Sequence, residues 1–302
     1  MNRNACLLIT GANGFTGQHA YRYFSELGIN VIPMFHNHSQ ITHSNNGVVC
    51  DLTNKTEVMN LIKKIKPDYV LHLAGRNSVL ESWKQPLEYV EVNIMGTSYL
   101  LEALRQEVPN CKTVILGSAL QSDFTKNTIP PHPYSLSKTI QAMIADAWGE
   151  LIGSNIVIAK PSNLIGPGES KGICSLIGKK LIDIKMEKCE PVIEIHNLQD
   201  TRDFLDVRDA VAAYHILLCE GEAGKKYDIG SGTKRSLSEV LKEYREITKL
   251  DFQVEETNNR KNKDQSDLVL NDIRQLGWTP RIQFTDSLKD ILKYMRGNIR
   301  VR

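Results

Sequence analysis

Short apolar runs alternate with longer amphipathic runs along the first two-thirds of the chain. The runs that read as buried strands are ACLLIT (5–10), NVIPMF (30–35), GVVC (47–50), DYVLHLAG (68–75), CKTVILGS (111–118) and SNIVIAKPSN (154–163). Amphipathic segments of helical period separate most of these runs, which predicts βαβ units around a parallel sheet. Pro33 argues weakly against the second strand, because proline cannot donate to a ladder. We therefore expect an α/β fold with a doubly wound parallel sheet.

A glycine-rich loop joins the first expected strand to the first expected helix. ITGANGFTGQ places Gly11, Gly14 and Gly17 at the end of a strand and the start of a helix. The first glycine permits a tight turn, the second lets the backbone approach a pyrophosphate, and the third allows the helix to pack closely on the strand. An ordinary turn also uses glycine freely, but the strand–loop–helix context favours dinucleotide binding.

The last third of the chain is less regular. It contains an expected strand at PVIEIHN, a strand that turns into a helix at RDFLDVRDAVAAYHILLC, and a helix that Ser236 and Glu239 open as a possible capping box. The predicted domain boundaries are 1–163, with contributions from about 192–218, for the dinucleotide-binding domain, and 164–191 with 219–302 for a small C-terminal lobe.

The composition is that of an ordinary soluble globular protein. The 302 residues are 41% hydrophobic and 24% charged, and the formal net charge of +2 gives no strong attraction to nucleic acid or a membrane. No apolar run approaches the roughly 20 residues of a membrane span, and the N-terminus runs into the glycine loop without room for a signal peptide. The six cysteines form no CxxC pair. This fits reduced thiols in a cytoplasmic protein and not a disulfide scaffold or a metal site.

The segment PHPYSLSK (131–138) opens an expected helix and holds Tyr134 and Lys138 four residues apart. Residues i and i+4 share a helix face, so the two side chains should point the same way. The ordinary pKa of tyrosine, about 10, is too high for easy proton exchange at neutral pH. An ammonium group alongside favours the phenolate and should lower that pKa. The pair is therefore a candidate acid–base site.

Together these motifs resemble the extended short-chain dehydrogenase/reductase family, which contains nucleotide-sugar epimerases, dehydratases and reductases. Besides GxxGxxG and YxxxK, the chain carries CDLTN, LHLAG, VNIMGT, KPSNLIGPG and RDFLDVRD in the order and positions of that family. The resemblance covers nearly the whole chain. It implies a Rossmann-type sheet that binds a nicotinamide dinucleotide and a small substrate-binding lobe.

The resemblance also implies roles for particular residues. Ser118 would hydrogen-bond the substrate oxygen, Tyr134 would exchange a proton, and Lys138 would tune Tyr134 and bind the nicotinamide ribose. The residues implied at the cofactor are Gly11, Asn13, Gly14, Phe15, Thr16, Gly17, His36, Asn37, His38, Asp51, Leu52, Leu73, Ala74, Gly75, Asn93, Tyr134, Lys138 and Pro161. The residues implied at the nucleotide-diphosphate sugar substrate are Ser78, Asn163, Lys179, Arg202 and Arg260, with Arg76 as a further candidate for sugar selectivity.

The residues after Ser118 distinguish the reactions of this family. Its dehydratases carry an Asp-Glu pair there for elimination, and its GDP-fucose-forming epimerase-reductases place a cysteine nearby. Here Ala119 and Leu120 follow, which argues against 4,6-dehydration and against epimerisation at C3 and C5. The chain is more similar to the NDP-4-keto-6-deoxyhexose reductases, such as the GDP-6-deoxy-4-keto-mannose reductases, in segments that include LGWTPRI. We therefore predict reduction of the C4 ketone of a nucleotide-linked 4-keto-6-deoxyhexose.

Two departures from that subgroup leave the sugar open. The subgroup reads SSEEYG where this chain reads SALQSD, and the interval between Ser118 and Tyr134 is shorter than usual. GDP-4-keto-6-deoxymannose and UDP-4-keto-6-deoxy-N-acetylhexosamine are both candidate substrates. A nucleotide-sugar 4-epimerase with tightly bound NAD is the alternative reaction. A non-catalytic dinucleotide sensor ranks last, because Tyr134 and Lys138 are both kept.

The end of the second strand bears on the choice of cofactor. Enzymes that use NAD usually place a carboxylate there, on the ribose diol. This chain offers His36, Asn37, His38 and Ser39 instead. These side chains would not repel a 2′-phosphate, so we expect NADPH in preference to NADH or NAD.

The family resemblance also implies a homodimer in which two helices of each subunit form a four-helix bundle. The helices concerned would be those around 91–106 and 134–151. Their apolar residues on more than one face are Ile94, Tyr99, Ile140, Ile144 and Trp148.

Overall fold

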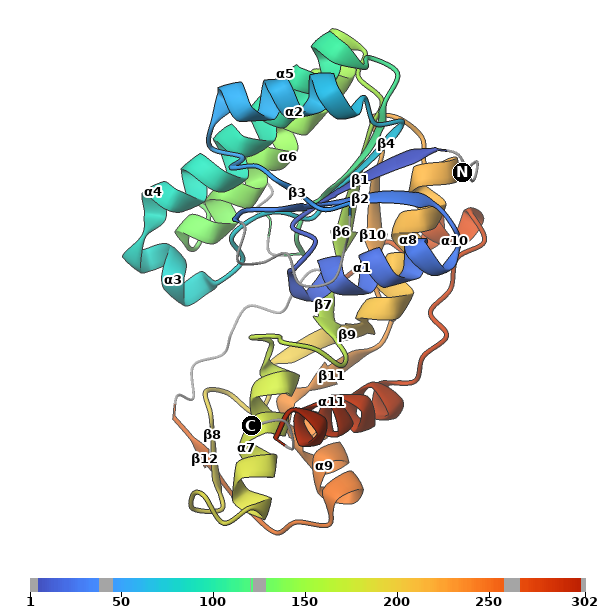
Figure 1. The fold of residues 1–302 in the computed structure, drawn as a ribbon. Coiled ribbons are helices and arrows are strands. Elements are labelled where there is room, and N and C mark those ends of the chain that lie inside the picture. The colour runs from blue at the N-terminus through green and yellow to red at the C-terminus, as the bar shows by residue number, and fades with distance from the viewer. Residues whose placement is uncertain (1–4, 38–45, 120, 122–128, 258–266, 300–302) are drawn as a thin grey trace. The chain divides into compact units, whose positions relative to one another are not determined.

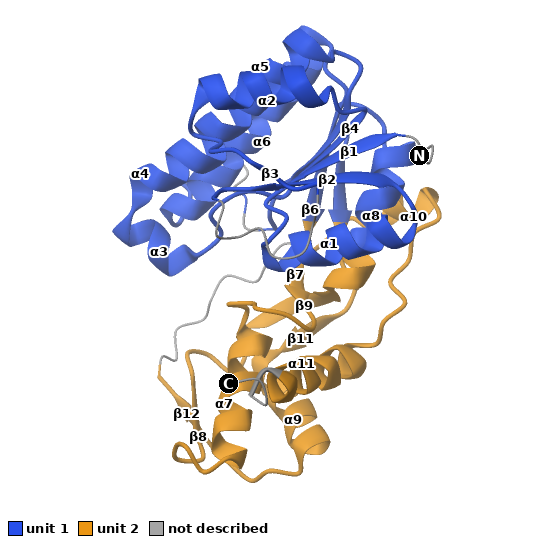
Figure 2. Cartoon of the chain, in the orientation of Figure 1, with its two compact units in different colours: residues 1–160, 211–228 blue, residues 161–210, 229–302 orange. Residues whose placement is uncertain are grey.

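The computed structural model describes residues 5–37, 46–119, 121, 129–257 and 267–299. The chain forms two compact units (Figure 2): unit 1 is Met1–Lys160 with Val211–Asp228, and unit 2 is Pro161–Ala210 with Ile229–Arg302. Of the segment 192–218 that the sequence assigns to the dinucleotide-binding domain, residues 211–218 lie in unit 1 and residues 192–210 in unit 2.

A seven-stranded sheet organises unit 1, in the order β10-β6-β5-β4-β1-β2-β3 (Figure 1). Its strands are β1 (Cys6–Thr10), β2 (Asn30–Phe35), β3 (Val48–Val49), β4 (Tyr69–His72), β5 (Lys112–Leu116), β6 (Ile156–Pro161) and β10 (Lys226–Ile229). The pairings of β1 with β2 and β4, of β2 with β3, and of β5 with β4 and β6 are all parallel. The chain therefore winds outward from β1 in both directions, which confirms the predicted doubly wound α/β fold.

Pro33 lies inside β2, opposite Ile9 of β1. The neighbour on the other side, β3, pairs only with Met34 and Phe35. Pro33 is therefore outside the part of β2 that has a strand on both sides, so the missing N–H does not interrupt a central ladder.

Helices cover both faces of this sheet (Figure 1): α2 (Lys55–Ile65), α5 (Gly96–Glu107) and α6 (Pro133–Ile152) on one face, α1 (Phe15–Glu26) and α8 (Val207–Glu220) on the other. The apolar core beneath α2 and α5 includes Leu8, Val58, Ile62, Val70 and Leu100. Between β4 and α5 the chain forms α3 (Val79–Lys84), α4 (Pro86–Tyr89) and a π-helical turn, η2 (Val90–Met95). Burial of one stripe of each helix against the sheet fixes the strand ends that carry the candidate site.

Local sequence signals explain both ends of α6. Pro133 occupies the first turn, where its missing N–H costs nothing, and the His132 side chain caps the helix by accepting from Ser135 N at 2.9 Å. Gly153 ends the helix in the left-handed region, with a φ of 74°. The helix that carries Tyr134 and Lys138 is thus held at its first and last turns.

Unit 2 contains a three-stranded sheet of order β11-β9-β7, a two-stranded sheet of β12 and β8, and four described helices besides the start of α8. Its elements are β7 (Asn163–Ile165), α7 (Ile173–Lys185), β8 (Val192–Ile195), β9 (Thr201–Asp206), β11 (Lys234–Ser236), α9 (Leu237–Thr248), β12 (Gln253–Glu256), α10 (Asn271–Gln275) and α11 (Phe284–Ile299). The capping box of Ser236 and Glu239 opens α9 as predicted.

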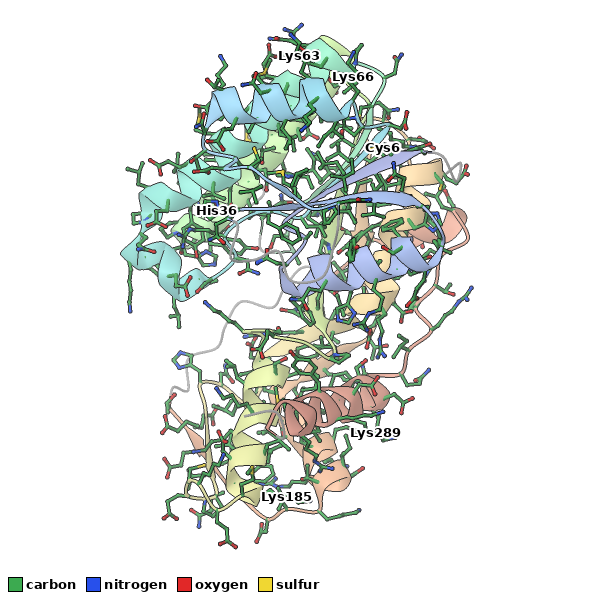
Figure 3. All side chains as sticks on the ribbon, viewed as in Figure 1. Cys6, His36, Lys63, Lys66, Lys185 and Lys289 are labelled. Carbon is green, nitrogen blue, oxygen red and sulfur yellow. The ribbon has the colours of Figure 1, made fainter. Side chains whose placement is uncertain are left out.

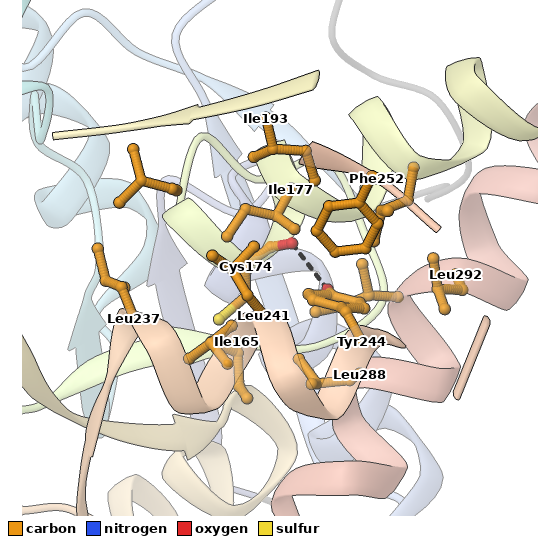
Figure 4. Packing of buried hydrophobic residues seen from close by; sticks show 14 of the residues in the cluster. Ile165, Cys174, Ile177, Ile193, Leu237, Leu241, Tyr244, Phe252, Leu288 and Leu292 are labelled. Atoms are coloured by element: carbon orange, nitrogen blue, oxygen red, sulfur yellow. Dashed lines mark hydrogen bonds between the residues drawn. The ribbon is translucent and has the colours of Figure 1, made fainter. Parts of the chain in front are cut away.

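Unit 2 has its own apolar core, in which α7, α9 and α11 contribute most of the side chains (Figure 4). Members of this unit 2 core include Ile165, Cys174, Ile177, Leu181, Leu241, Tyr244, Leu288 and Leu292. The Tyr244 hydroxyl donates to Cys174 O at 2.7 Å, so the one polar group of this large ring is satisfied inside the core. Among the helices of the described residues, none is long and apolar enough to cross a membrane.

Candidate active site

The glycine loop follows β1, and two of its glycines are required by the protein's own backbone. Gly11 has a φ of +67°, and a Cβ there would lie 2.8 Å from the backbone of Ala74. A Cβ on Gly17 would lie 2.1 Å from Gly11 O. Gly14 is less crowded, since its nearest neighbour, Gly11 O, would be 3.2 Å from a Cβ. The packing role expected of Gly17 is therefore visible in the backbone, whereas the expected contact of Gly14 with a pyrophosphate stays a prediction.

The N-terminus of α1 is open toward the glycine loop. Gly14 is its N-cap, so no side chain caps the helix, and the first turn contains no acidic residue. The unpaired N–H groups and the positive end of the helix dipole suit a phosphate group. Asn13, Phe15 and Thr16 flank this terminus and are half-buried.

At the ends of β2 and β3, the structure brings His36 near Asp51. His36 Nδ1 lies 3.8 Å from Asp51 Oδ1, and the His36 side chain is 68% exposed. His36 is labelled in Figure 3. Asp51 Oδ1 also accepts from Thr53 N at 2.9 Å and Thr53 Oγ1 at 2.8 Å. Asn37 is exposed and Leu52 is buried, while His38 lies outside the described residues. Two of the residues predicted to read the adenosine end of the cofactor are thus close together.

The end of β4 continues into Leu73, Ala74 and Gly75, which are half-buried or exposed. Asn93 is fully buried behind them. Its Oδ1 accepts from Arg76 N at 2.8 Å, and its Nδ2 donates to Arg76 O at 3.0 Å and to Ser137 Oγ at 2.9 Å. Both amide hydrogens are therefore used within the protein. Any influence of Asn93 on a cofactor would be indirect, through the loop and α6.

The π-helical turn η2 is a feature that the sequence did not reveal. The pattern predicted one long helix across VEVNIMGTSYLLEALRQ, but Gly96 N bonds to Glu91 O, five residues back. Thr97 Oγ1 donates to Asn93 O at 2.7 Å just after this turn. The wide turn adds one residue to the helix and so changes which side chains face α6.

Ser118 and Tyr134 meet at the start of α6. The Tyr134 hydroxyl donates to Ser118 Oγ at 3.2 Å, and both side chains are buried. Burial raises the pKa of Tyr134, and the hydrogen bond with Ser118 opposes this shift. The structure therefore differs from the sequence expectation of a lowered pKa: burial, and not Lys138, is the largest influence on this phenol.

Lys138 lies one turn after Tyr134 and is also buried, at 7% exposed. Its Nζ donates to Leu116 O and to Gln141 Oε1, both at 2.5 Å. Desolvation lowers the pKa of Lys138 to about 7, so this ammonium group can lose its proton near neutral pH. The hydrogen bonds direct Lys138 toward the end of β5, and the shift of the Tyr134 pKa comes from burial, Ser118 and Tyr89.

Two aromatic side chains hold the Tyr134 ring. His132 stacks on it, with 5.9 Å between ring centroids and 10° between ring planes, and Tyr89 packs edge-on at 6.3 Å. Neither contact was foreseen. The position of His132 before a proline at the start of a helix was the available signal, because that is where an N-cap belongs.

The residues predicted at the substrate are divided between the two units. In unit 1, Ser78 Oγ caps α3 by accepting from Glu81 N at 3.2 Å, and Arg76 forms an ion pair with Glu88. Three more of these residues belong to unit 2. Asn163 Nδ2 donates to Asp203 O at 3.0 Å, and Arg202 Nε donates to Asp200 Oδ2 at 2.9 Å. Lys179 is exposed on α7. Pro161 is buried at the end of β6, and Arg260 lies outside the described residues.

The chain matches known proteins over nearly its full length. It is 26% identical to GDP-6-deoxy-D-mannose reductase of Pseudomonas aeruginosa, over 97% of this chain and 98% of that protein. It is also 26% identical to dTDP-glucose 4,6-dehydratase of Haemophilus influenzae, over 95% and 97% of the two chains.

Solved structures are similar as well. The structure of RMD from Pseudomonas aeruginosa complexed with NADPH matches with a TM-score of 0.81 and 25% identity, over 98% of this chain and 100% of that one. UDP-glucose 4-epimerase of Thermus thermophilus in complex with NAD matches with a TM-score of 0.83 and 22% identity, over 97% and 99%, which shows the shared fold alone. Residues 7–230, which include the glycine loop, Ser118, Tyr134 and Lys138, match a family described as the NAD dependent epimerase/dehydratase family, and the chain belongs to that family.

Proposed function

We propose that this protein is an NADPH-dependent reductase of the C4 ketone of a nucleotide-linked 4-keto-6-deoxyhexose. The observation that carries the proposal is the buried arrangement of Ser118, Tyr134 and Lys138, with Tyr134 OH 3.2 Å from Ser118 Oγ. The similarity to GDP-6-deoxy-D-mannose reductase over 97% of this chain supports the same reaction class. A nicotinamide dinucleotide fits the open N-terminus of α1 and the glycine loop.

The residues that follow Ser118 in the sequence favour reduction over dehydration. Elimination of water across C5 and C6 needs an additional acid and base, and the two residues that follow Ser118 are Ala119 and Leu120. Neither can exchange a proton. This argues against the dehydration that is named for one of the relatives to which the chain is also similar.

The proposed chemistry uses each buried side chain once. NADPH, when bound, supplies a hydride to C4 of the sugar. Ser118 hydrogen-bonds the ketone oxygen, and Tyr134 donates its phenolic proton to that oxygen as C4 becomes tetrahedral. The products are a secondary alcohol, NADP⁺ and a Tyr134 phenolate, which Lys138 stabilises until the phenol regains a proton from solvent. Burial raises the pKa of Tyr134, which keeps the phenol protonated and suits a proton donor.

The preference for NADPH rests on the end of β2. No carboxylate follows Phe35 in the sequence HNHS, and His36 is exposed there. An imidazole can bind a 2′-phosphate, and we infer that His36, Asn37 and His38 do so while Asp51 contacts the adenosine. The solved structure of RMD with NADPH supports this preference.

We infer that the substrate diphosphate is bound by cationic side chains, with Arg202, Lys179 and Arg260 as candidates, and that Asn163 contacts the first phosphate or the sugar. Arg202 is paired with Asp200, so binding would share or replace that ion pair. The nucleotide sugar product would serve the synthesis of cell-surface polysaccharides, in the cytoplasm. Six cysteines without disulfides are consistent with that compartment.

We also propose a homodimer formed through α5 and α6. Of the apolar residues predicted for this interface, Ile94 is buried and the others are half-buried. Exposed apolar side chains occur on α6, among them Leu136, Met143 and Leu151, and Met95 is exposed at the end of η2, next to α5. Exposed apolar surface of this kind favours association. Light scattering at micromolar concentration should give twice the chain mass, and a monomer would contradict the proposal.

The test of the reaction is to offer GDP-4-keto-6-deoxymannose and UDP-4-keto-6-deoxy-N-acetylhexosamine separately, each with NADPH and with NADH. Loss of absorbance at the nicotinamide band gives the rate, and NMR of the product gives the configuration at C4. Turnover of either sugar with NADPH supports the proposal and identifies the nucleotide. Conversion of an unreduced nucleotide hexose without added cofactor would instead indicate a 4-epimerase with bound NAD.

A further inference from the structure

A chain of buried side chains lies behind Lys138, and the proposed chemistry does not use it. Lys138 Nζ donates to Gln141 Oε1 at 2.5 Å, and Gln141 Nε2 donates to Thr97 Oγ1 at 2.7 Å. His72 Nε2 lies 2.9 Å from Thr97 Oγ1, and His72 Nδ1 lies 2.8 Å from Thr10 Oγ1. We call these five residues the Lys138 network. They come from β1, β4, α5 and α6, and none is more than 7% exposed.

Thr97 determines the direction of the bonds in the middle of the network. Its hydroxyl has one hydrogen, which it donates to Asn93 O at 2.7 Å. Thr97 Oγ1 must therefore accept both of its other bonds, one from Gln141 Nε2 and one from His72 Nε2. The proton of a neutral His72 ring is thus on Nε2.

The contacts of His72 and Thr10, at the other end of the network, agree with a proton on His72 Nε2. Desolvation, with a smaller contribution from the charge of Lys138, lowers the pKa of His72 to about 3, so the ring is neutral at physiological pH. With its proton on Nε2, the ring accepts at Nδ1 from the Thr10 hydroxyl. Thr10 Oγ1 in turn accepts from Ala74 N at 3.1 Å. Each buried hydrogen in the network then has a definite acceptor.

The same matching of hydrogen-bond donors with acceptors determines the orientation of the Gln141 amide. Its two ends differ only in which atom is oxygen and which is nitrogen. Thr97 offers only an acceptor, so the NH₂ group of Gln141 must face Thr97. The carbonyl oxygen then faces Lys138. The reversed amide would set an NH₂ donor against the ammonium group, which also has only hydrogens to offer.

We propose that Gln141 is a positioning residue whose carbonyl oxygen holds the Lys138 ammonium group at the end of β5. Thr97, whose hydrogen is given to Asn93 O, keeps the Gln141 amide in that orientation. The strand that opens the glycine loop and the helix that carries Tyr134 are thereby linked by side chains as well as by packing. This inference rests on the proposed function only for its catalytic consequence, because the geometry holds for any ligand.

The proposed role of Gln141 predicts the direction in which the Lys138 pKa should change when its partners are substituted. The other titratable side chains near it are His72 from β4 and Tyr134 on the preceding turn of α6. Because Lys138 is buried, each acceptor that it loses should make its charged form less stable. Removal of the Gln141 carbonyl should therefore lower the Lys138 pKa, and a carboxylate in its place should raise it.

The experiment measures the Lys138 pKa directly, by NMR of protein labelled with ¹³C at lysine Cε and titrated between pH 5 and pH 10. The signal absent from Lys138→Met identifies the residue. In Gln141→Met we expect the pKa to fall by about one unit, the order of magnitude of a hydrogen bond to a charged group. In Gln141→Glu we expect it to rise. Opposite shifts distinguish positioning from a packing role, which would move both variants the same way.

Gln121 provides a matched control. It contacts Lys138 at the backbone and not at the ammonium group: Gln121 Nε2 donates to Lys138 O at 2.8 Å. Gln121→Met should leave the ammonium pKa where it is. Thr97→Val, which removes the acceptor for Gln141, should lower the pKa as Gln141→Met does, whereas Thr97→Ser should not. These Thr97 variants decide the question if circular dichroism shows that Gln141→Met is unfolded.

An unchanged Lys138 pKa in folded Gln141→Met, or the same direction of shift in the Met and Glu variants, would overturn the inference. The titration needs no substrate, so its result is independent of the proposed reaction. If the protein proves to be a reductase, the alkaline limb of its kcat profile should also move to lower pH in Gln141→Met. If no variant reduces a 4-keto sugar, the proposed function fails while the NMR result still decides the role of Gln141.

Discussion

The Lys138 network of unit 1 and the unit 2 core are both buried, yet the first consists of polar groups and the second of apolar side chains. The network consists of hydroxyl, imidazole, amide and ammonium groups, linked by bonds of 2.5–2.9 Å. The unit 2 core consists of aliphatic and aromatic side chains, with the bond from Tyr244 to Cys174 O inside it (Figure 4).

The two regions depend on different properties of their side chains. Apolar packing depends on volume, is nearly independent of pH and tolerates exchanges that conserve volume. A buried polar network depends on every donor having its acceptor, and loss of one partner leaves another unsatisfied. We infer that unit 1 keeps this network because the proposed reaction requires Lys138 and Tyr134 to be buried and yet to exchange protons.

The largest expected effect is on the reaction. Tyr134→Phe keeps the ring that His132 stacks upon but removes the proton donor. We expect kcat to fall by at least the ~10²–10⁴-fold typical of general acid catalysis, with NADPH affinity largely retained. Tyr99→Phe on α5 is the control and should keep full activity. A Tyr134→Phe enzyme with unchanged kcat would remove this residue from the chemistry.

The next effect concerns the unit 2 core. Leu241 is 2% exposed, and Leu241→Ala should cost about 2–5 kcal/mol of unfolding free energy through lost transfer energy and a cavity. Because no charge is involved, the cost should be the same at pH 6 and pH 8. Fluorescence of the buried Trp278, with Trp83 and Trp148 replaced by Phe, follows unit 2 during urea denaturation. Val269→Ala, at a residue 61% exposed, should cost little, and a cost for Leu241→Ala that varies with pH would contradict the comparison.

The third effect is the response of unit 1 to acid. His72 has a native pKa of about 3 and an unfolded pKa of about 6.5. Between these values the unfolded chain binds the extra proton, so stability is fully present above pH 6.5 and falls as the pH drops toward 3. The slope from this one group is at most about 1.4 kcal/mol per pH unit.

His72→Gln keeps a donor and an acceptor but cannot titrate, so the stability of unit 1 should depend less on pH between 7 and 5. The measurement is urea denaturation across that range. His196→Gln, at an exposed residue of unit 2, is the control and should leave the slope as it is. If the unfolding free energy falls equally steeply with pH in His72→Gln and in the unsubstituted protein, His72 is not the cause of the loss of stability in acid.

The smallest effect is that of the polar contact inside the unit 2 core. Tyr244→Phe removes the hydroxyl that donates to Cys174 O at 2.7 Å and keeps the ring. We expect a loss of about 1 kcal/mol, the net value of an ordinary hydrogen bond. The Trp278 signal again reports the change. A loss as large as that of Leu241→Ala would mean that unit 2, too, depends on its polar contact.

Much of unit 1 could be predicted from sequence because its signals are local. The strand–loop–helix at Gly11, Gly14 and Gly17 and the alternation of apolar runs are each read within a short window, and together they predict a doubly wound parallel sheet. The spacing of Tyr134 and Lys138 likewise places both on one helix face.

What could not be predicted depends on contacts between distant residues. The turn η2 differs from an α-helix by a single residue, which leaves the apolar pattern almost unchanged. His72 meets Thr97 and Thr10 across 25 and 62 residues, so nothing near His72 in the sequence indicates that its ring is neutral. The direction of the Tyr134 pKa shift was mistaken for the same reason: helical spacing shows that Lys138 is near, but not that the fold buries the phenol, which raises its pKa.

The most direct test of the proposed reaction is transfer of a labelled hydride. NADPH with deuterium on the transferring position of the nicotinamide is mixed with the protein and a nucleotide-linked 4-keto-6-deoxyhexose, and the product is examined by NMR and mass spectrometry. We predict one deuterium, bound to C4 of a single stereoisomer, and one NADP⁺ formed for each sugar reduced. A product without deuterium at C4, or conversion of sugar without oxidation of NADPH, would contradict the account.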